Sequence, residues 1–371
     1  MSSPITLWAF FRRHIAALQE QYAVTVIANI GQDVSLPFDA EVHVIPVMIE
    51  RKISLLRDLR ALICLVDIFR RHSFGVVHSV TPKAGLLAMA AAWLTKVPVR
   101  IHVFTGQVWA TRTGAARAGL KALDGVIAKL ATHVLVDSHS QREFLLANRV
   151  VNVSKSTVLA NGSTCGADGE RFRPDEEARR HTRDILGIPD GAVVFLYLGR
   201  LNRDKGLLDL TAAFAVLAAG DPAVHLLVAG PDEEGLRPQV QALLTAFAER
   251  VRLVEYTDRP EHFMAAADVL CLPSYREGFP QVAIEAAAAG LPVIASRIYG
   301  VTDAVVDGET GLLHPPGDVK ALCSRMEALA SAPQLRRELG AAGRARVLRD
   351  FSQDLVTQTL LAYYACVTRK L

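Results

Sequence analysis

The sequence lacks paired cysteine spacings, long apolar runs and a large net charge. Its five cysteines are scattered without a C-x-x-C pair, which excludes a disulfide framework or a zinc site and fits a reducing cytoplasm. The longest uncharged apolar run of the first half, Ala84–Leu94, is too short to cross a bilayer, which takes about 20 residues. Because 51% of the 371 residues are hydrophobic, the composition excludes disorder, and the length predicts two domains.

Charge is small in total but divided unevenly along the chain. The formal net charge is +3, yet residues 1–165 hold 18 Lys and Arg against 10 Asp and Glu, whereas residues 166–371 hold 23 against 28. Uneven solvated surfaces are one explanation, and an anionic partner of the first half, such as a membrane surface or a phosphate-bearing substrate, is the other. Nucleic-acid binding is disfavoured, since no basic-aromatic platform motif occurs and the second half is acidic.

Short β-branched runs alternate with longer amphipathic segments through most of the chain. Runs such as Val99–Phe104 and Val193–Leu198, separated by helix-like segments, are typical of parallel sheets covered on both faces. The alternation restarts after a polar stretch, Asn161–Arg180. We therefore predict an α/β fold of two tandem Rossmann-like, doubly wound domains with a ligand cleft between them, at 1–165 and 166–350, with a C-terminal helix at 351–371 that packs back onto the first domain.

The first domain has no obvious first strand. A doubly wound domain opens with a strand, a tight turn and a helix, but here only Met1–Pro4 precede the first helix-like segment. The usual Gly-rich turn is replaced by Ser2–Thr6. We expect the first sheet to lack a strand near the cleft, at some local cost.

The most informative stretch is Asp268–Gly290, in which a buried run is followed by a loop and then a helix. Glu277 lies in the loop within the sequence E-G-F-P, and Glu285 lies eight positions later on the helix. Free N–H groups at the start of the helix suit an anion or a hydroxyl group, and a half-buried carboxylate suits sugar hydroxyls. Each glutamate alone would be ordinary as a solvent-facing or helix-dipole residue, so the signal is the pair.

A second motif, Gly199–Gly206, also follows a buried run and opens a helix. Gly199 marks the end of the strand, and the loop after it carries Arg200 and Lys205. Two cations at the carboxyl edge of a sheet suit a diphosphate, because Arg offers a planar fork and Lys a point charge. A solvated charged loop is the alternative, but the glutamates predicted at the same edge favour a ligand site.

Together with Asp307–Leu313 (D-G-E-T-G-L-L), these motifs resemble glycosyltransferase family 4, whose members are retaining, nucleotide-sugar-dependent enzymes of the GT-B fold. The spacing of Glu277 and Glu285 matches the E-x7-E signature of that family. In the first half, Arg100–Gly114 is similar to members that build bacterial O-antigen, capsule or other lipid-linked glycans. The resemblance implies a donor domain at 166–350 and an acceptor domain at 1–165.

The resemblance also implies roles on the donor side. Arg200 and Lys205 would hold the diphosphate and neutralise the leaving nucleotide, Glu277 would contact the sugar hydroxyls, and Glu285 would bind the ribose. Further donor-side positions would lie against sugar, phosphate or base: Gly199, Gly230, Tyr256, Gly278, Phe279, Pro280 and Val282. No D-x-D metal motif occurs in a suitable loop, and two cations can supply the electrostatics of a metal, so we expect neither a metal ion nor a further cofactor.

The acceptor side matches the family less well. Thr105 and Gly106 follow the run Val99–Phe104, where relatives place an acceptor-side loop, although many of them have a histidine directly before this glycine. His102 lies three residues earlier and joins Glu277, Arg200 and Lys205 as a catalytic candidate. A histidine that is simply hydrogen-bonded within its strand is an equally good interpretation.

Basic and apolar residues occur together in the first half at Ile5–Leu18, which includes Trp8, and basic residues recur at Arg51–Arg60 and Arg70–His72. Such segments can rest on an anionic bilayer, which would place the protein peripherally at the inner face of the cytoplasmic membrane. The alternative for Ile5–Leu18 is a first helix that packs its apolar side onto the sheet.

The combined prediction is a retaining transferase that moves a hexose or N-acetylhexosamine from a nucleotide sugar, with UDP favoured over GDP, to a lipid-linked or polysaccharide acceptor in cell-envelope glycan biosynthesis. The acceptor hydroxyl would attack from the face that the nucleotide leaves, and the leaving phosphate would take its proton. Glu277 is therefore not one half of a hydrolase carboxylate pair. Two alternatives stay open: a nucleotide-sugar 2-epimerase of similar architecture, and a non-catalytic nucleotide-sugar-binding protein.

Overall fold

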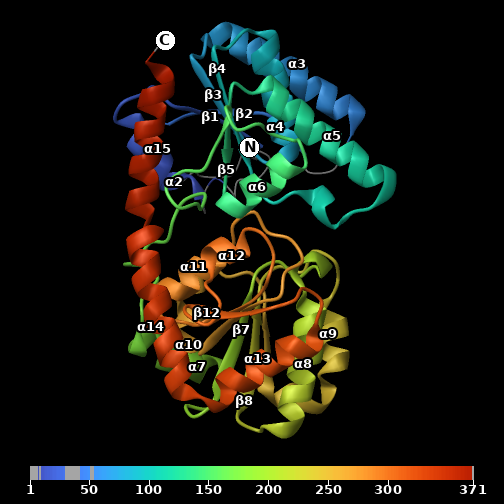
Figure 1. The fold of residues 1–371 in the computed structure, drawn as a ribbon, viewed down its shortest axis with the longest axis vertical. Coiled ribbons are helices and arrows are strands. Elements are labelled where there is room, and N and C mark those ends of the chain that lie inside the picture. The colour runs from blue at the N-terminus through green and yellow to red at the C-terminus, as the bar shows by residue number, and fades with distance from the viewer. Residues whose placement is uncertain (1–6, 8–9, 30–41, 51–53, 370–371) are drawn as a thin grey trace. The chain divides into compact units, whose positions relative to one another are not determined.

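The structure, a computed structural model, describes residues 7, 10–29, 42–50 and 54–369 (Figure 1). The chain divides into two compact units: unit 1 is Met1–Cys165 with Asp354–Leu371, and unit 2 is Gly166–Gln353. Met1–Pro4 and the rest of Ser2–Thr6 lie outside the described residues, as do Trp8 and the start of Arg51–Arg60. The predicted cleft between the domains stays a prediction.

Unit 1 alternates strands and helices along the chain. Its strands are β1 (Thr25–Ala28), β2 (His43–Pro46), β3 (Val76–Val80), β4 (Val99–Phe104), β5 (His133–Val136) and β6 (Ser156–Thr157). Its helices are α2 (Arg12–Gln19), α3 (Leu55–His72), α4 (Pro82–Leu94), the 3-10 turn η1 (Val108–Thr111), α5 (Gly114–Leu130), α6 (His139–Ala147) and α15 (Gln353–Thr368).

Helices cover both faces of the four-stranded sheet β3-β4-β5-β6. Successive side chains of a strand point to opposite faces of the sheet, so neighbouring residues of one strand pack against different helices. In β5, Val134 and Val136 pack with α3, α4, α5 and α6, whereas Leu135 packs with α2 and α15 on the other face. The apolar residues Phe11, Ile15 and Leu18 belong to that second cluster. The described part of Ile5–Leu18 therefore packs its apolar side into the core, as the alternative to membrane contact predicted.

The parallel sheet of unit 1 is divided into two. β1 pairs with β2 in the register Thr25↔His43, and β3, β4, β5 and β6 pair consecutively in a second sheet. All of these pairs are parallel, so the predicted Rossmann-like architecture is confirmed. Within the described residues, no strand joins β1 to β3, where a doubly wound sheet would have its first strand.

Unit 2 holds one continuous parallel sheet. Its strands are β7 (Val193–Leu198), β8 (Val224–Ala229), β9 (Val251–Val254), β10 (Val269–Leu272), β11 (Val293–Ser296) and β12 (Gly311–His314). Its helices and 3-10 turns are α7 (Glu176–Leu186), η2 (Arg203–Lys205), α8 (Leu207–Gly220), α9 (Arg237–Leu243), η3 (Thr245–Arg250), α10 (Pro260–Ala266), α11 (Gln281–Ala288), α12 (Val301–Ala304), α13 (Val319–Ser331) and α14 (Pro333–Asp350).

The strand order of unit 2 is β12-β11-β10-β7-β8-β9, the doubly wound order in which the chain first builds one half of the sheet and then the other. The order reverses between β7 and β10, which are neighbours. Buried apolar residues fill both faces, as the continuous runs predicted: every residue of β8 and β10 is buried.

Asp268, the first residue of the stretch Asp268–Gly290, has a structural role at the start of β10. Its carboxylate accepts hydrogen bonds from Arg179 at 2.7 Å and from Arg183 at 2.8 Å, and Arg183 is fully buried. It also accepts from the backbone N–H of Val194 at 2.7 Å, which ties α7 to the central strands. The half-buried Asp268 carboxylate has three donors, so its desolvation is compensated and the two ion pairs hold the base of the sheet together.

Among the helices that the structure describes, none is both long and apolar enough to cross a membrane.

Candidate active site

Both predicted motifs of the second half lie at the carboxyl edge of the unit 2 sheet, where the strand order reverses. The loop 199–206 follows β7, and the loop 273–280 follows β10. Since β7 and β10 are paired, through Val269↔Phe195 and Leu270↔Leu196, the two loops leave the sheet side by side. This switch point is the general ligand-binding position of open α/β sheets.

The two loops touch because Gly206 has no side chain. Its φ is +69°, a left-handed conformation, and a Cβ atom there would lie 2.0 Å from the carbonyl oxygen of Pro273. The N–H of Tyr275 donates to the carbonyl of Asp204 at 2.9 Å, and Arg276 forms an ion pair with the Asp204 carboxylate at 3.2 Å. The two loops are thus held in one arrangement by backbone and side-chain bonds.

This arrangement brings Lys205 and Glu277 together. Lys205 Nζ donates to Glu277 Oε1 at 2.5 Å, with 23% of the lysine side chain and 10% of the glutamate side chain exposed. The side chain of Asn202 accepts from the backbone N–H of Lys205 at 3.1 Å and so fixes the turn that carries the lysine. Because an ammonium has three N–H donors, Lys205 can hold Glu277 and a ligand oxygen at the same time.

Arg200 is paired with an acidic residue, Glu233, that was not predicted from the sequence. Its guanidinium donates to both carboxylate oxygens of Glu233, at 3.0 and 3.2 Å, in the loop after β8. The hydroxyl of Tyr197 donates to the Arg200 carbonyl at 2.7 Å. The available signal was the acidic run Asp232–Glu234, directly after a buried strand. Both cations of the predicted diphosphate site are therefore paired with carboxylates.

The ends of β7 and β8 also lie close together at this edge of the sheet. A Cβ atom at Gly230 would lie 1.9 Å from the carbonyl oxygen of Gly199, so the ends of β7 and β8 approach as closely as backbones can. Tyr256 follows β9, at the outer strand of this half of the sheet, and its side chain is exposed. Gly199 and Gly230 thus lie at adjoining strand ends, and Tyr256 lies after the next strand.

On the other side of the switch point, α11 carries the second glutamate. Gln281 Nε2 donates to Glu285 Oε1 at 3.3 Å and to the carbonyl of Gly166 at 2.6 Å. Burial of the Glu285 carboxyl raises its pKa to about 7, only partly opposed by the Gln281 hydrogen bond. Near neutral pH this group can therefore either accept a hydrogen bond or donate one, which suits a sugar hydroxyl pair.

The residues between Glu277 and Glu285 are predicted to contact the donor through their backbone rather than through their side chains. Gly278 precedes Phe279, whose ring is buried and lies 5.2 Å from the ring of Phe351, centroid to centroid. Pro280 is the N-cap residue of α11, and Val282 is a half-buried residue packed against the core. The predicted contact through the backbone of this segment is thus compatible with the packing, since the Phe279 side chain faces inward.

The motif Asp307–Leu313 forms the turn into β12. Asp307 Oδ1 accepts from the backbone N–H of Leu313 at 2.8 Å, and Asp307 is also paired with Arg297. A Cβ atom at Gly311 would lie 2.2 Å from the carbonyl oxygen of Val293. The residue types in this motif are explained by the turn and by close strand packing.

In unit 1, His102 is a packed residue of β4. It is 1% exposed, its Nδ1 lies 2.9 Å from Ser79 Oγ, and its ring meets Phe104 edge-on at 4.7 Å. Burial lowers the His102 pKa to about 3, so the ring is neutral. This geometry favours the hydrogen-bonded strand histidine over the catalytic contact, and a catalytic role for His102 stays a prediction.

Thr105 and Gly106 follow the carboxyl end of β4 and are half-buried. The Thr105 carbonyl accepts from Gln141 Nε2 at 2.7 Å and from Gln107 Nε2 at 2.5 Å. Asp137 directly follows the neighbouring strand β5. Its buried carboxyl accepts from Thr164 Oγ1 at 3.1 Å and has its pKa raised by burial to about 7. Sequence reasoning missed Asp137, although an Asp-Ser pair directly after an apolar strand was a usable signal.

Chemically, unit 2 offers a lysine, a nearby arginine and two glutamates at one sheet edge. Within the residues that the structure describes, no group of three or more His, Cys, Asp or Glu side chains is arranged to hold a metal ion. The arrangement can bind an anionic group through Lys205 and Arg200 and hydroxyl groups through Glu277 and Glu285.

Two family models match this chain, one on each unit. Residues 7–162 match the "Glycosyl transferase 4-like domain", and residues 178–346 match "Glycosyl transferases group 1". The second match contains every donor-side position predicted from the sequence, and the first contains His102, Thr105 and Gly106.

Relatives and solved structures give the same result over longer spans. "Capsular polysaccharide biosynthesis glycosyltransferase CapM" of Staphylococcus aureus is 32% identical over 343 residues, 92% of this chain and 89% of the relative. "UDP-Gal:alpha-D-GlcNAc-diphosphoundecaprenol alpha-1,3-galactosyltransferase" of Escherichia coli is 27% identical over 281 residues, 74% of this chain and 71% of the relative. The crystal structure of Anabaena HepE in complex with UDP-glucose superposes with a TM-score of 0.78 at 19% identity and covers 95% of this chain and 94% of HepE.

Proposed function

Because this chain belongs to the family 4-like glycosyltransferases and is a transferase of the GT-B fold, we propose that it moves a hexose or N-acetylhexosamine from a UDP-sugar to a lipid-linked or polysaccharide acceptor, with retention of anomeric configuration. The observation that carries the proposal is the Lys205–Glu277 pair at the switch point of unit 2. Transfer is supported over the epimerase and binding-protein alternatives by the name of the S. aureus relative, a glycosyltransferase that matches both units.

The donor diphosphate would bind at Lys205 and Arg200. These cations are paired with Glu277 and Glu233, so each lies in a negative environment of the kind that a diphosphate provides. Lys205 has donors for both partners, and the guanidinium of Arg200 offers a planar fork to phosphate oxygens. Two cations at the leaving group supply the charge stabilisation that transfer requires, and the proposal therefore includes no metal ion.

Glu277 would orient the donor sugar by accepting hydrogen bonds from its hydroxyls, while the hydrogen bond from Lys205 holds the carboxylate in place. The bond between the anomeric carbon and the diphosphate oxygen breaks, and the acceptor oxygen bonds to the same face of that carbon. The proton of the acceptor hydroxyl goes to the departing phosphate oxygen. No protein base is needed, which agrees with a Glu277 that is occupied by an ammonium group rather than poised for proton transfer.

The choice of UDP is supported by two comparisons. HepE was crystallised with UDP-glucose, and the E. coli relative is named for a UDP-Gal donor. Glu285 on α11, with its pKa near 7, is the residue proposed to bind the ribose hydroxyls.

Acceptor and pathway class are supported by the printed names of the relatives. The S. aureus relative is named for capsular polysaccharide biosynthesis, and the E. coli relative for a lipid diphosphate acceptor. We propose that this chain likewise extends a cell-envelope glycan, with unit 1 as the acceptor side and the segment Thr105–Gly106 at the sugar-facing end of β4.

Peripheral membrane contact is proposed through α3 rather than through α2. The α2 residues Phe11, Ile15 and Leu18 are buried, whereas α3 exposes four large apolar side chains on one side: Leu55, Leu56, Leu59 and Ile63. Arg57 and Arg60 are exposed between them. Apolar residues flanked by cations on one helix are suited to an anionic bilayer surface.

A donor panel tests the function directly. The full chain is incubated with bacterial membrane extract as acceptor source and with UDP-glucose, UDP-galactose, UDP-GlcNAc, UDP-GalNAc or GDP-mannose, and nucleotide release is measured. The expected result is acceptor-dependent release from one UDP-sugar, an α-linked product from that α-linked donor by NMR, and loss of release in Glu277→Gln and Lys205→Ala. The exposed Lys320→Ala on α13 is the matched control and keeps activity. An inverted product would overturn the retaining mechanism, and release without acceptor that yields an epimerised donor would overturn transfer.

A further inference from the structure

The loop that follows β4 is anchored at two buried side chains. Gln107 is almost fully buried, and its side-chain oxygen accepts a hydrogen bond from Gln141 Nε2 on α6 at 3.1 Å. Trp109 in η1 is equally buried, and its indole N–H donates to the Asp124 carboxylate on α5 at 2.7 Å. Because a buried polar group without a partner is costly, these bonds fix the loop on α5 and α6.

Helix α5 places two cations over the Trp109 ring. Arg117, Lys121 and Asp124 lie on one side of the helix, since the spacing i, i+4, i+7 returns to the same face. Arg117 Cζ lies 5.5 Å and Lys121 Nζ 5.8 Å from the centroid of the Trp109 ring. Both cationic side chains are half-buried. The ring therefore holds two positive charges together beside the loop.

No carboxylate balances this pair of cations. Asp124 is the only acidic residue among residues 105–130, which hold four Lys and Arg, and its carboxylate accepts from the Trp109 indole. Within the part of the chain that the structure describes, neither Arg117 nor Lys121 forms an ion pair with Asp or Glu, and the Lys121 ammonium donates to the neutral amide of Asn148 at 3.4 Å. Half-buried cations without a counter-ion favour an anionic ligand.

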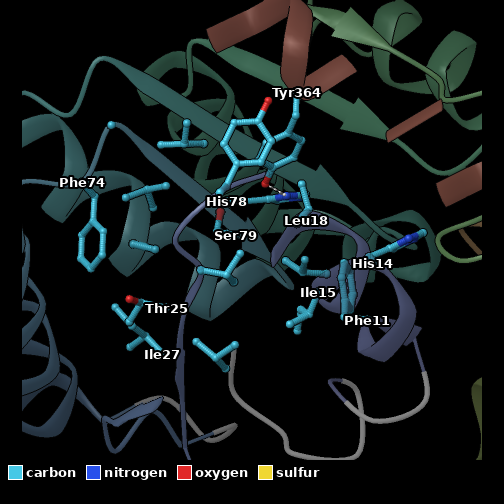
Figure 2. A pocket seen from close by; sticks show the side chains of 18 of the residues that line it. Phe11, His14, Ile15, Leu18, Thr25, Ile27, Phe74, His78, Ser79 and Tyr364 are labelled. Atoms are coloured by element: carbon cyan, nitrogen blue, oxygen red, sulfur yellow. Dashed lines mark hydrogen bonds between the residues drawn. The ribbon is translucent and has the colours of Figure 1, made fainter. Parts of the chain in front are cut away.

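The cavity of unit 1 does not offer a comparable charge. Its volume is about 540 Å³, and the described residues that line it include no Lys or Arg. Its two histidines are His14 and His78, and Figure 2 shows the hydrogen bond between His78 and Tyr364. Burial lowers the pKa of His14 and lowers that of His78 to about 4, so both rings are neutral at pH 7. The α5 cations are therefore better suited to an anionic group than this cavity is.

Exposed apolar side chains on the same layer of helices indicate that a lipid carries the anion. Helices α3, α4 and α5 cover one face of the sheet, and α4 packs against both of the others. The end of α4 exposes Trp93 and Leu94, and α5 exposes Leu123 and Val126. A phosphate joined to a hydrocarbon chain matches cations beside exposed apolar groups, whereas a free phosphate leaves the apolar groups in water.

We propose that Arg117 and Lys121 bind the phosphate end of a lipid-linked acceptor beside the loop that begins at Thr105. This inference rests on the proposed transferase function and deepens it, because it narrows the acceptor class to lipid phosphates. Arg117 offers a planar fork and Lys121 a point charge to the phosphate oxygens. The bound phosphate anchors the acceptor, and the sugar joined to it is held near Thr105.

Binding of a soluble prenyl diphosphate tests the proposal. Farnesyl diphosphate is titrated calorimetrically into the full chain with saturating UDP, which occupies the proposed donor site of unit 2, and farnesol is the phosphate-free comparison. The expected result is an affinity for farnesyl diphosphate that falls by about 30-fold or more in the double variant Arg117→Gln, Lys121→Gln. The exposed Lys129→Gln on the same helix is the matched control, and its affinity is expected to stay within about twofold. The charge-preserving Arg117→Lys is expected to lose about threefold, because it keeps the charge and lacks the fork.

Vesicle binding separates this site from a general attraction to anionic bilayers. Co-sedimentation with phosphatidylcholine vesicles that contain phosphatidylglycerol is expected to be unchanged in the double variant, since α3 is the proposed bilayer contact. The proposal is overturned if the double variant binds farnesyl diphosphate as Lys129→Gln does, or if farnesol binds as tightly as farnesyl diphosphate. It is also overturned if vesicle binding is lost together with the binding of farnesyl diphosphate.

Nucleotide release separates this proposal from the proposed function. With membrane extract and the preferred UDP-sugar, the double variant is expected to need about tenfold or more acceptor for half-maximal release, at an unchanged KM for the donor. An unchanged acceptor requirement in a folded, active double variant overturns the acceptor site alone. If the unsubstituted chain releases no nucleotide with any donor, the transferase function fails, and the loss of farnesyl diphosphate binding in the double variant still supports a lipid phosphate site.

Discussion

The ion pair between Lys205 and Glu277 leads to opposite predictions for its two partners. Glu277 accepts from one of the three N–H donors of Lys205 at 2.5 Å, so its negative charge lies beside the position proposed for the diphosphate and repels it. Lys205→Ala removes the cation that the diphosphate needs. Glu277→Gln leaves the cation and removes the negative charge beside it, while it also removes the carboxylate proposed to orient the sugar.

The magnitudes follow from the burial of the pair. A hydrogen bond to a charged group contributes about 1.5–3 kcal/mol, so Lys205→Ala is expected to weaken UDP binding by about 10- to 150-fold. The lysine is 23% exposed and the pair is therefore partly screened, worth about 1 kcal/mol. Removal of the neighbouring negative charge is expected to tighten UDP binding to Glu277→Gln by about fivefold. Transfer in the same variant is expected to fall by about 100-fold or more, because the contact to the reacting sugar is gone.

Isothermal titration with UDP measures the first two effects, and nucleotide release with saturating donor measures the third. Circular dichroism melts verify that each variant is folded, and Lys320→Ala, on the surface of α13, is the matched lysine control. The reasoning is refuted if Glu277→Gln weakens UDP binding as strongly as Lys205→Ala does. It is refuted equally if both variants bind UDP as the unsubstituted protein does.

Three further predictions concern packing and pH. Gly206→Ala, whose Cβ would lie 2.0 Å from a carbonyl oxygen, is expected to destabilise unit 2 by about 2–4 kcal/mol in thermal melts, whereas Gly220→Ala, with open space around it, is expected to leave Tm unchanged or higher. UDP affinity is expected to rise between pH 6 and 8 as Glu285, whose pKa is about 7, becomes the carboxylate that accepts hydrogen bonds from the ribose hydroxyls. A pH-independent affinity, or an unchanged pH dependence in Glu285→Gln, would contradict that role. The Asp137 pKa is raised from 3.8 to about 7 by burial, so between these pH values the folded state binds one proton more than the unfolded state, and the free energy of unfolding falls as pH rises through them. Asp137→Asn is expected to flatten that fall in urea titrations at pH 5 and 8. An unchanged pH dependence of the free energy of unfolding would contradict this prediction.

Periodicity was sufficient to predict most elements of this fold. Runs such as Val99–Phe104 and Val193–Leu198 are strands with the predicted bounds, because a strand buried on both faces must be continuously apolar over its own length. The motifs Gly199–Gly206 and Asp268–Gly290 were likewise readable, since a glycine-bearing loop between a strand and a helix is a local feature. Their shared position at one sheet edge followed from the parallel topology.

Contacts between distant segments were not readable. Glu233 holds Arg200 from a loop 33 positions away, and no local pattern distinguishes that carboxylate from its acidic neighbours. The residues on either side of His102 in β4 are both apolar, so the strand pattern does not show whether the ring is exposed. Only the packing of Gly85 and Ser79 against the ring shows that it is enclosed. Similarly, α2 and α3 both carry apolar and basic residues, and the sheet decides which of them is covered.

What the sequence by itself determined is the order of strands and helices, the two Rossmann-like units and the family signature, because each depends on residues close together in the chain. Tertiary structure alone decided which charges meet at the switch point and that Phe279 and His102 face inward. These features depend on strand pairing across tens of residues and on the shapes of packed side chains. Local patterns do not encode such contacts between distant segments.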